Sequence, residues 1–277
     1  METENKTILG AIIGDVVGSR YEFRNVKSTN FELFPQGCRP TDDTVMTLAV
    51  ANWLMTDPEH NKETLVTQMQ TLGQKYPNAG YGGNFFLWLY RREAKPYGSW
   101  GNGSAMRVSP VGLFAKDIDE AMHLAKLTAE VSHNHPEGIK GAQAIACGMV
   151  LSKQKKSKEE IRKFIEHTFG YDLSRTIEEI RPGYSFDVSC QGSVPVAIRA
   201  FLEGNSFEEV IRLAVSVGGD SDTIGAMAGA LASCYYDIPK EIAFSARKAV
   251  PKELLEINDC FLEFLDDRLS ILSTNQG

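Results

Sequence analysis

The chain has 277 residues, of which 43% are hydrophobic and 23% charged, as in an ordinary globular protein with a sizeable core. Its 29 basic and 36 acidic side chains leave a net charge of −7, which argues against a protein that binds a nucleic-acid backbone along a basic face. Five widely spaced cysteines without a C-x-x-C pair match neither a disulfide framework nor a zinc site. No stretch approaches the roughly 20 apolar residues of a membrane span. We therefore expect a cytoplasmic, monomeric protein with no membrane partner and one domain over residues 1–277.

Apolar side chains recur with helical spacing along most of the chain, and convincing two-residue alternation is absent. Two S-x-x-E capping boxes, Ser157 with Glu160 and Ser206 with Glu209, predict helix starts. One irregular stretch is expected at about 181–192, where proline and glycine interrupt the pattern. The sequence predicts an all-α fold, a single compact multi-helix domain, whose clearest periodic segments are 45–54, 121–128, 210–214 and 254–265.

Small residues form stripes on two of the expected helices. Gly10, Gly14 and Gly18 recur every four positions, and a similar stripe runs through 225–232. Glycine costs about 1 kcal/mol relative to alanine inside a helix. We interpret the stripes as surfaces where helices pack backbone to backbone, which would let the ends of those helices converge.

Two acidic pairs stand where apolar helices are expected to begin. One lies in Thr41-Asp42-Asp43-Thr44 and the other in the run GGDSDTIGAMAGALA at 218–232. Helix N-capping would explain one acid at each site but not two. If the two helix starts meet, their carboxylate and hydroxyl oxygens form a pocket that favours Mg²⁺, Mn²⁺ or Ca²⁺ over zinc. The candidate ligands are the carboxylates of Asp42, Asp43, Asp220 and Asp222, together with the hydroxyls of the threonines that follow each pair.

Three further stretches carry groups that could take part in chemistry. Glu22 stands between two aromatic residues, so it is either a general acid or base with a raised pKa or an exposed carboxylate. The run WGNGSAMRVSP at 100–110 is a glycine loop whose backbone N–H groups could bind phosphate, although such a loop alone is usually a turn. His133 and His135 flank a helix start led by proline, where a turn is more common than a metal site.

Taken together and in this order, the runs GDVVGSRYEF, PTDDTVMTLA, GNGSAMRVSPVG, SHNHPEG and GGDSDTIGAMAGAL resemble the ADP-ribosylglycohydrolase family. They span residues 8–232. The resemblance implies an all-α fold, a centre of two divalent ions (Mg²⁺ or Mn²⁺), and hydrolysis of the bond that joins ADP-ribose to an acceptor. The expected partner is an ADP-ribosylated protein or another ADP-ribose conjugate.

The resemblance also assigns roles to individual residues. By their match to the family's two metal motifs, the expected metal ligands are Thr41, Asp42, Asp43, Asp220, Asp222 and Thr223. Glu22 matches a catalytic acid, and Asp222 is expected to act in catalysis as well as in metal binding. Apart from the resemblance, the position of Asp15 in the glycine-rich first helix suggests that it supports the site through hydrogen bonds. The distal ribose is expected to bind the metals through its hydroxyls, with cleavage through an oxocarbenium-like state. The implied substrate-binding residues are Gly101, Asn102, Gly103, Ser104, Met106, His133 and His135.

Two other functions stay open on the sequence alone. An acidic two-metal site also suits a phosphoesterase, which would release AMP instead of intact ADP-ribose. A non-catalytic ADP-ribose-binding protein of the same fold is the second alternative. Among the acceptors, arginine on protein is our first expectation, ahead of serine, a nucleic-acid base and small metabolites such as O-acetyl-ADP-ribose. The segment 21–40 is expected to line the acceptor side, with Phe31 and Phe34 assigned to the core.

Overall fold

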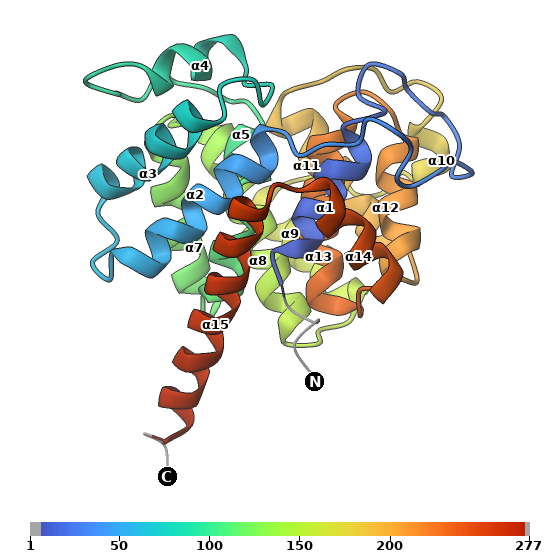
Figure 1. The fold of residues 1–277 in the computed structure, drawn as a ribbon. Helices are drawn as coiled ribbons and strands as arrows, with labels where there is room; N and C mark the ends of the chain where they lie inside the picture. The colour runs from blue at the N-terminus through green and yellow to red at the C-terminus, as the bar shows by residue number, and fades with distance from the viewer. Residues whose placement is uncertain (1–6, 275–277) are drawn as a thin grey trace.

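The computed structural model describes residues 7–274, and within them the chain forms fifteen α-helices and no β-strand (Figure 1). The predicted all-α fold and the four periodic segments are confirmed, because each segment lies inside a helix. The helices are α1 (Leu9–Gly18), α2 (Asp42–Thr56), α3 (Lys62–Lys75), α4 (Gly83–Leu89), α5 (Gly103–Met106), α6 (Ser109–Phe114), α7 (Ile118–Glu130), α8 (Pro136–Lys153), α9 (Lys158–Phe169), α10 (Ile177–Ile180), α11 (Cys190–Glu203), α12 (Phe207–Ser216), α13 (Ser221–Tyr235), α14 (Lys240–Ala249) and α15 (Lys252–Thr274).

The two predicted capping boxes both start helices, but only one is complete. At α9, Ser157 Oγ accepts from the backbone N–H of Glu160, and the Glu160 carboxylate accepts from the backbone N–H of Ser157. At α12, Ser206 accepts from the N–H of Glu209, while the Glu209 carboxylate bonds the N–H of Asn205 instead. Each arrangement satisfies N–H groups that have no partner inside the helix.

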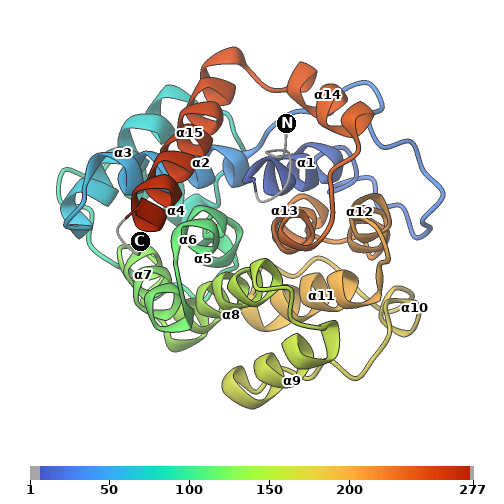
Figure 2. The same ribbon diagram turned by 90° about the horizontal axis from the view of Figure 1, so that it is seen from below.

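Helices α1 and α13 lie side by side in the centre of the domain, as the view from below shows (Figure 2). The predicted glycine stripes form their contact. A Cβ atom on Gly14 would overlap the carbonyl group of Gly225, and one on Gly10 would overlap that of Gly229. Because only glycine allows this approach, the two backbones pack directly against each other.

Helix α13 is buried from Ser221 to Cys234 and also packs against α8, α11 and α12. Its close contact with α1 brings the start of α13 beside Gly18, since a Cβ there would overlap the backbone of Ser221 and Asp222. The start of α2 reaches the same place, where Thr41 bonds Asp15 of α1. Two helix N-termini and their acidic residues therefore meet at one point in the fold.

Two irregular segments border this point, residues 19–41 and residues 181–189 (Figure 1). Lys27 holds them together, because its Nζ donates to the carbonyls of Arg181, Tyr184 and Val217 at 3.0, 2.7 and 2.6 Å. The irregular stretch predicted at about 181–192 ends at Ser189, three residues earlier than expected, since α11 begins at Cys190 with Ser189 as its cap. Phe31 and Phe34 pack on the core as expected.

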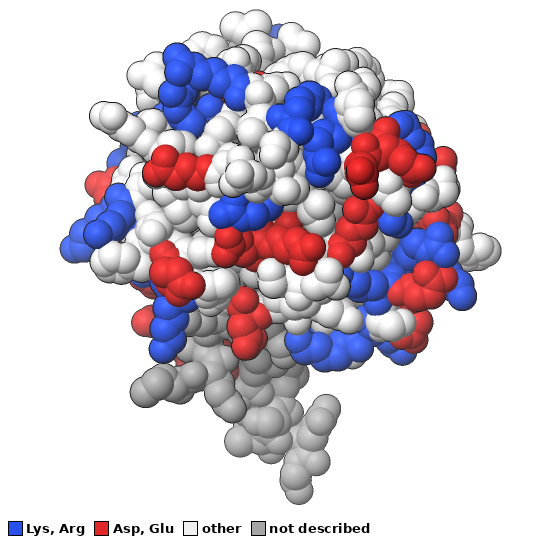
Figure 3. Space-filling model, turned by 90° about the vertical axis from the view of Figure 1, so that its right-hand side faces the viewer, with Lys and Arg blue, Asp and Glu red and all other residues white. Residues whose placement is uncertain are grey.

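Within the described residues, no helix is both long enough and apolar enough to cross a membrane. On the face drawn in Figure 3, Lys and Arg side chains are interspersed with Asp and Glu side chains. That face carries no continuous basic stripe of the kind that follows a nucleic-acid backbone.

Candidate metal centre and substrate cavity

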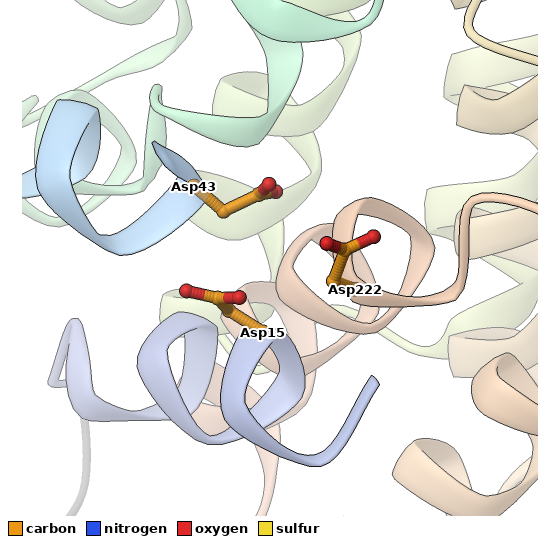
Figure 4. Close-up of side chains that lie close together, drawn as sticks. All are labelled: Asp15, Asp43 and Asp222. Carbon is orange, nitrogen blue, oxygen red and sulfur yellow. The ribbon is translucent and has the colours of Figure 1, made fainter. Parts of the chain in front are cut away.

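Asp15 of α1, Asp43 of α2 and Asp222 of α13 point toward one another at the place where these helices meet (Figure 4). Each offers a carboxylate oxygen within 4.8 Å of the others. Asp222 also belongs to a second group with Glu22 and Asp220, built to the same spacing. Asp222 is thus shared by two clusters of three acidic residues. Two neighbouring cations could bind here, one at each cluster, with Asp222 between them.

Asp15 is fully buried and its carboxylate is saturated by hydrogen bonds. Oδ1 accepts from Thr41 Oγ1 at 2.7 Å, while Oδ2 accepts from the N–H groups of Thr41 and Thr44 at 2.9 and 3.0 Å. The Thr44 hydroxyl bonds Oδ2 as well. Asp15 thereby fixes the start of α2, which agrees with the supporting role expected for it.

The acids in this cluster are not explained by helix capping. Thr41 caps α2, because its Oγ1 accepts from the N–H of Asp43. Asp220 occupies the N-cap position of α13 without any side-chain capping bond, and its Oδ2 accepts instead from Asn102 Nδ2 at 2.7 Å. Asp43 Oδ1 is buried and has no hydrogen-bond partner among the described residues. A buried carboxylate oxygen without a donor fits a cation ligand, and the all-oxygen set fits Mg²⁺ or Mn²⁺.

Burial and mutual repulsion raise the pKa of the clustered acids. Burial, together with Asp15 and Asp220, raises the pKa of Asp42 to about 8. Burial raises the pKa of Asp43 and of Asp222 well above the ordinary range, with neighbouring aspartates adding to the effect. The positive ends of α2 and α13 lie at the cluster and favour negative charge there. A divalent cation would relieve the remaining repulsion.

Glu22 lies at the edge of the cluster, on the segment that follows α1. Burial and the nearby Asp220 raise its pKa to about 7, while Arg39 opposes the shift. Glu22 is half-buried and not fully exposed, and its carboxylate lies within 4.8 Å of oxygens of Asp220 and Asp222.

A cavity of about 650 Å³ opens above the acids. A volume of this order suits a nucleotide-sized ligand. All six predicted metal ligands line the cavity, four with carboxylates and two, Thr41 and Thr223, with hydroxyls. The other predicted residues in its lining are Glu22, Gly101, Asn102, Gly103, Met106 and His133. Two predicted residues are not part of its lining, Ser104 and His135.

The glycine loop connects the acidic cluster to the other wall of the cavity. The side chain of Asn102 reaches Asp220, while the N–H groups of Gly101 and Asn102 donate to Ser99 Oγ and to the carbonyl of Val188. These two N–H groups are therefore already used within the protein. The loop leads into α5, whose first residues, Gly103 and Ser104, carry N–H groups without a partner inside the helix. The Ser104 hydroxyl is buried and donates to the carbonyl of Gly138.

The two predicted histidines have different surroundings. His133 is 5% exposed and lines the cavity beside the loop. Its pKa is lowered well below the ordinary value by burial and by the nearby Arg107, so the ring is neutral. His135 caps α8, because its Nδ1 accepts from the N–H of Glu137 at 3.1 Å. A capping role accounts for His135.

Sequence reasoning missed several residues that line the cavity. Phe23 and Phe186 stack at its mouth with ring centroids 6.2 Å apart, although they come from the two irregular segments. These two large apolar side chains are 82% and 50% exposed, which is unusual for phenylalanine, but the exposure of a side chain cannot be read from the sequence. Arg107 was also missed, although it stands inside the quoted GNGSAMR run, and it is fully buried.

Comparison with known proteins gives matches over most of the chain. The family model described as ADP-ribosylglycohydrolase matches residues 5–273. ADP-ribosylhydrolase ARH3 of Gallus gallus is 27% identical over 307 aligned positions, covering 83% of this chain and 84% of that protein. ADP-ribosylarginine hydrolase Tri1 of Pseudomonas putida (strain GB-1) is 26% identical, covering 83% of this chain and 70% of that protein.

A solved structure described as an ADP-ribosylglycohydrolase-related protein complex has a TM-score of 0.69 to this chain at 24% identity, covering 94% of this chain and 97% of that one. This likeness shows the fold. The family model, which matches nearly the whole chain, carries the assignment together with the buried acidic cluster. The chain belongs to the ADP-ribosylglycohydrolase family, a family of ADP-ribosyl hydrolases.

Proposed function

We propose that this chain is a divalent-metal-dependent hydrolase that cleaves the glycosidic bond between ADP-ribose and an acceptor, with ADP-ribosylarginine on protein as its first expected substrate. The observation that carries the proposal is a pair of acidic clusters, both of which contain Asp222, in the lining of a cavity large enough for a nucleotide. The activity would reverse ADP-ribosylation.

Six residues would hold the ions, with Asp222 shared between the two positions. When bound, Mg²⁺ or Mn²⁺ would stabilise negative charge and orient substrate oxygens. The chain itself supplies rigidity, because Asp15 anchors Thr41 and Thr44 while Asn102 anchors Asp220. The proposed ligands are Thr41, Asp42, Asp43, Asp220, Asp222 and Thr223.

Glu22 would act as the acid or base of the reaction. Its pKa of about 7 in the ion-free protein suits a group that takes up and gives back a proton near neutral pH. In the hydrolysis it would accept a proton from the attacking water as the water oxygen bonds to the anomeric carbon, and a proton would be given to the acceptor atom whose bond to that carbon breaks. The buried Asp222 lies beside Glu22, and its carboxylate would stabilise the positive charge that develops on the ribose during cleavage.

The cavity has walls of opposite character, which supports a ligand with hydroxyls at one end and phosphates nearer the other. Carboxylates of α2 and α13 form one wall. The other carries the buried Arg107, neutral His133 and the start of α5. We propose that the N–H group of Gly103 contacts the diphosphate, since those of Gly101 and Asn102 are already bonded and Ser104 does not line the cavity.

The mouth of the cavity supports arginine as the acceptor. Phe23 and Phe186 present exposed aromatic surface next to Glu22. A planar guanidinium stacks well on aromatic rings, better than the small side chain of serine. The Tri1 relative is named as an ADP-ribosylarginine hydrolase, which agrees with this choice.

The test is an analysis of products from matched substrates. Arginine-linked and serine-linked ADP-ribosyl peptides and O-acetyl-ADP-ribose are incubated with the protein and Mg²⁺ or Mn²⁺, and the products are separated by chromatography. We expect intact ADP-ribose, released fastest from the arginine peptide. AMP as the product would identify a phosphoesterase, and binding of ADP-ribose without release from any substrate would identify a binding protein.

A further inference from the structure

His133 contacts a short chain of hydrogen bonds that leads away from the cavity. Ser132 Oγ lies 2.8 Å from His133 Nδ1, and Arg107 Nη2 donates to the same Ser132 oxygen at 2.9 Å. Arg107 Nη2 also donates to the carbonyl of Thr128 at 2.7 Å. All of these groups are buried. Each donor and acceptor in the chain can therefore be counted.

The count fixes the position of a proton on His133. A guanidinium can only donate, so Ser132 Oγ accepts from Arg107. The single hydroxyl hydrogen of Ser132 is then left for His133 Nδ1, and the structure gives Ser132 Oγ no other partner among the described residues. Were Nδ1 to carry the hydrogen, Ser132 would accept twice and bury its own O–H without an acceptor, which costs about 1–3 kcal/mol.

From these contacts we infer that Arg107 and Ser132 are positioning residues: they fix His133 in the tautomer that carries its hydrogen on Nε2, and so present a neutral N–H donor to the ligand beside the glycine loop. A Cβ atom on Gly103 would stand 2.9 Å from Nε2, and one on Gly101 would stand 3.5 Å away. Neither glycine has a side chain that could occupy the space next to this nitrogen.

The ligand group that this donor fits is an anionic oxygen. The partners of the buried Arg107 are a carbonyl, a hydroxyl and the Phe85 ring, and none of them is a carboxylate. Its positive charge is therefore available to this wall of the cavity. Resting on the proposed function, we assign the His133 N–H to a phosphate oxygen of ADP-ribose.

Ser132→Ala is the variant that tests the relay, because it removes the hydroxyl and keeps the backbone. Ser109→Ala is its matched control, since Ser109 is equally buried and its Oγ has no hydrogen-bond partner among the described residues.

The first measurement is a long-range ¹H–¹⁵N correlation spectrum of protein labelled at histidine, with the His133 signals assigned by comparison with His133→Gln. We expect hydrogen on Nε2 and none on Nδ1 in the ligand-free protein and in the Ser109→Ala control. Ser132→Ala should show a mixture of tautomers. Hydrogen on Nδ1 in the unaltered protein, or an unchanged spectrum in Ser132→Ala, would overturn the inference.

The second measurement is calorimetric titration with ADP-ribose in Mg²⁺ buffer. Because only part of the Ser132→Ala population should carry the hydrogen on Nε2, its binding should weaken in proportion to that fraction, by about 2- to 10-fold, raising KM and leaving kcat nearly unchanged. Ser109→Ala should bind like the unaltered protein. Equal affinity in all three proteins would remove the ligand contact from the inference. Failure of the unaltered protein to bind ADP-ribose would refute the proposed function, while the spectrum still decides the tautomer.

Discussion

Thr223 donates a hydrogen bond of 3.1 Å from its hydroxyl to Asp43 Oδ2, joining two acidic motifs that lie 180 residues apart in the sequence. The bond crosses from the start of α13 to the start of α2. The other oxygen of Asp43, Oδ1, is buried and accepts no hydrogen bond within the described part of the chain. The two motifs therefore form one site, and Asp43 Oδ1 is a carboxylate oxygen of that site that could bind a cation.

Asp222→Asn should abolish binding of both ions, because Asp222 belongs to both acidic clusters. Calorimetry with Mn²⁺ should give two bound ions for the unaltered protein and none for the variant, and turnover should fall by about 100-fold or more. The exposed Asp237 provides the control, since Asp237→Asn changes the same net charge away from the site. Two ions retained by Asp222→Asn would exclude a shared ligand.

The ion-free protein should become less stable as the pH rises. Asp42 and Glu22 have ordinary pKa values of 3.8 and 4.5, and in the folded chain the values are raised to about 8 and about 7. The folded state thus holds these protons more tightly, so their stabilising contribution is complete below the ordinary values and is lost as the pH passes through the raised ones.

The measurement is the Tm of protein dialysed against chelator, from about pH 5 to about pH 8.5. We expect a fall of several degrees, a smaller fall in Asp42→Asn, and recovery of Tm at the upper end when Mg²⁺ or Mn²⁺ is added. A Tm of the ion-free protein that rises across this range would contradict the repulsion among the acids.

Asn102→Ala should weaken metal binding without removing a ligand. Asn102 Nδ2 donates to Asp220 Oδ2 at 2.7 Å, which holds that carboxylate in place. Loss of such a supporting bond typically costs about 10–100-fold in metal affinity or activity. Asn102→Asp should be worse, because it adds a negative charge beside Asp220. Mn²⁺ titrations of both variants decide this, and unchanged affinity in Asn102→Ala would show that Asp220 needs no anchor.

Gly14→Ala should destabilise the whole fold. The added methyl would overlap the Gly225 backbone, and backbone cannot move aside as a flexible side chain can. Overpacking of this kind costs about 1–3 kcal/mol, and we expect the upper end of that range. Gly183→Ala is the control, since a Cβ there meets no atom within 4 Å. Chemical denaturation of both variants provides the comparison, and equal stability would contradict direct packing of α1 on α13.

The helical fold and the convergence of the acids could be predicted from the sequence, because both depend on local patterns. Apolar spacing predicted helices such as α2 and α12, and the glycine stripes predicted the contact that brings Asp222 beside α1. The supporting position of Asp15 was expected from its place in the glycine-rich first helix, and its hydrogen bonds to Thr41 and Thr44 agree with that expectation. The catalytic role of Glu22 came from the resemblance and stays a prediction.

The rest of the site depends on contacts between distant segments, which carry no local pattern. Phe23 meets Phe186 only because two irregular segments cross at the cavity mouth. The two histidines show the same limit, since the spacing H-x-H does not reveal that His133 faces the cavity while His135 caps a helix. Which N–H groups of the glycine loop are already bonded also depends on partners far along the chain, such as Val188.

The central claim is that the carboxylates of this cavity, with divalent ions, cleave an ADP-ribose linkage. The most direct test measures release of ADP-ribose from arginine-linked and serine-linked ADP-ribosyl proteins, with Mg²⁺ or Mn²⁺ and with chelator, beside the double variant Asp220→Ala, Asp222→Ala. We predict release that requires the metal and disappears in the double variant. Release that persists in chelator and in the double variant, or no release from either substrate by the metal-loaded protein, would contradict the claim.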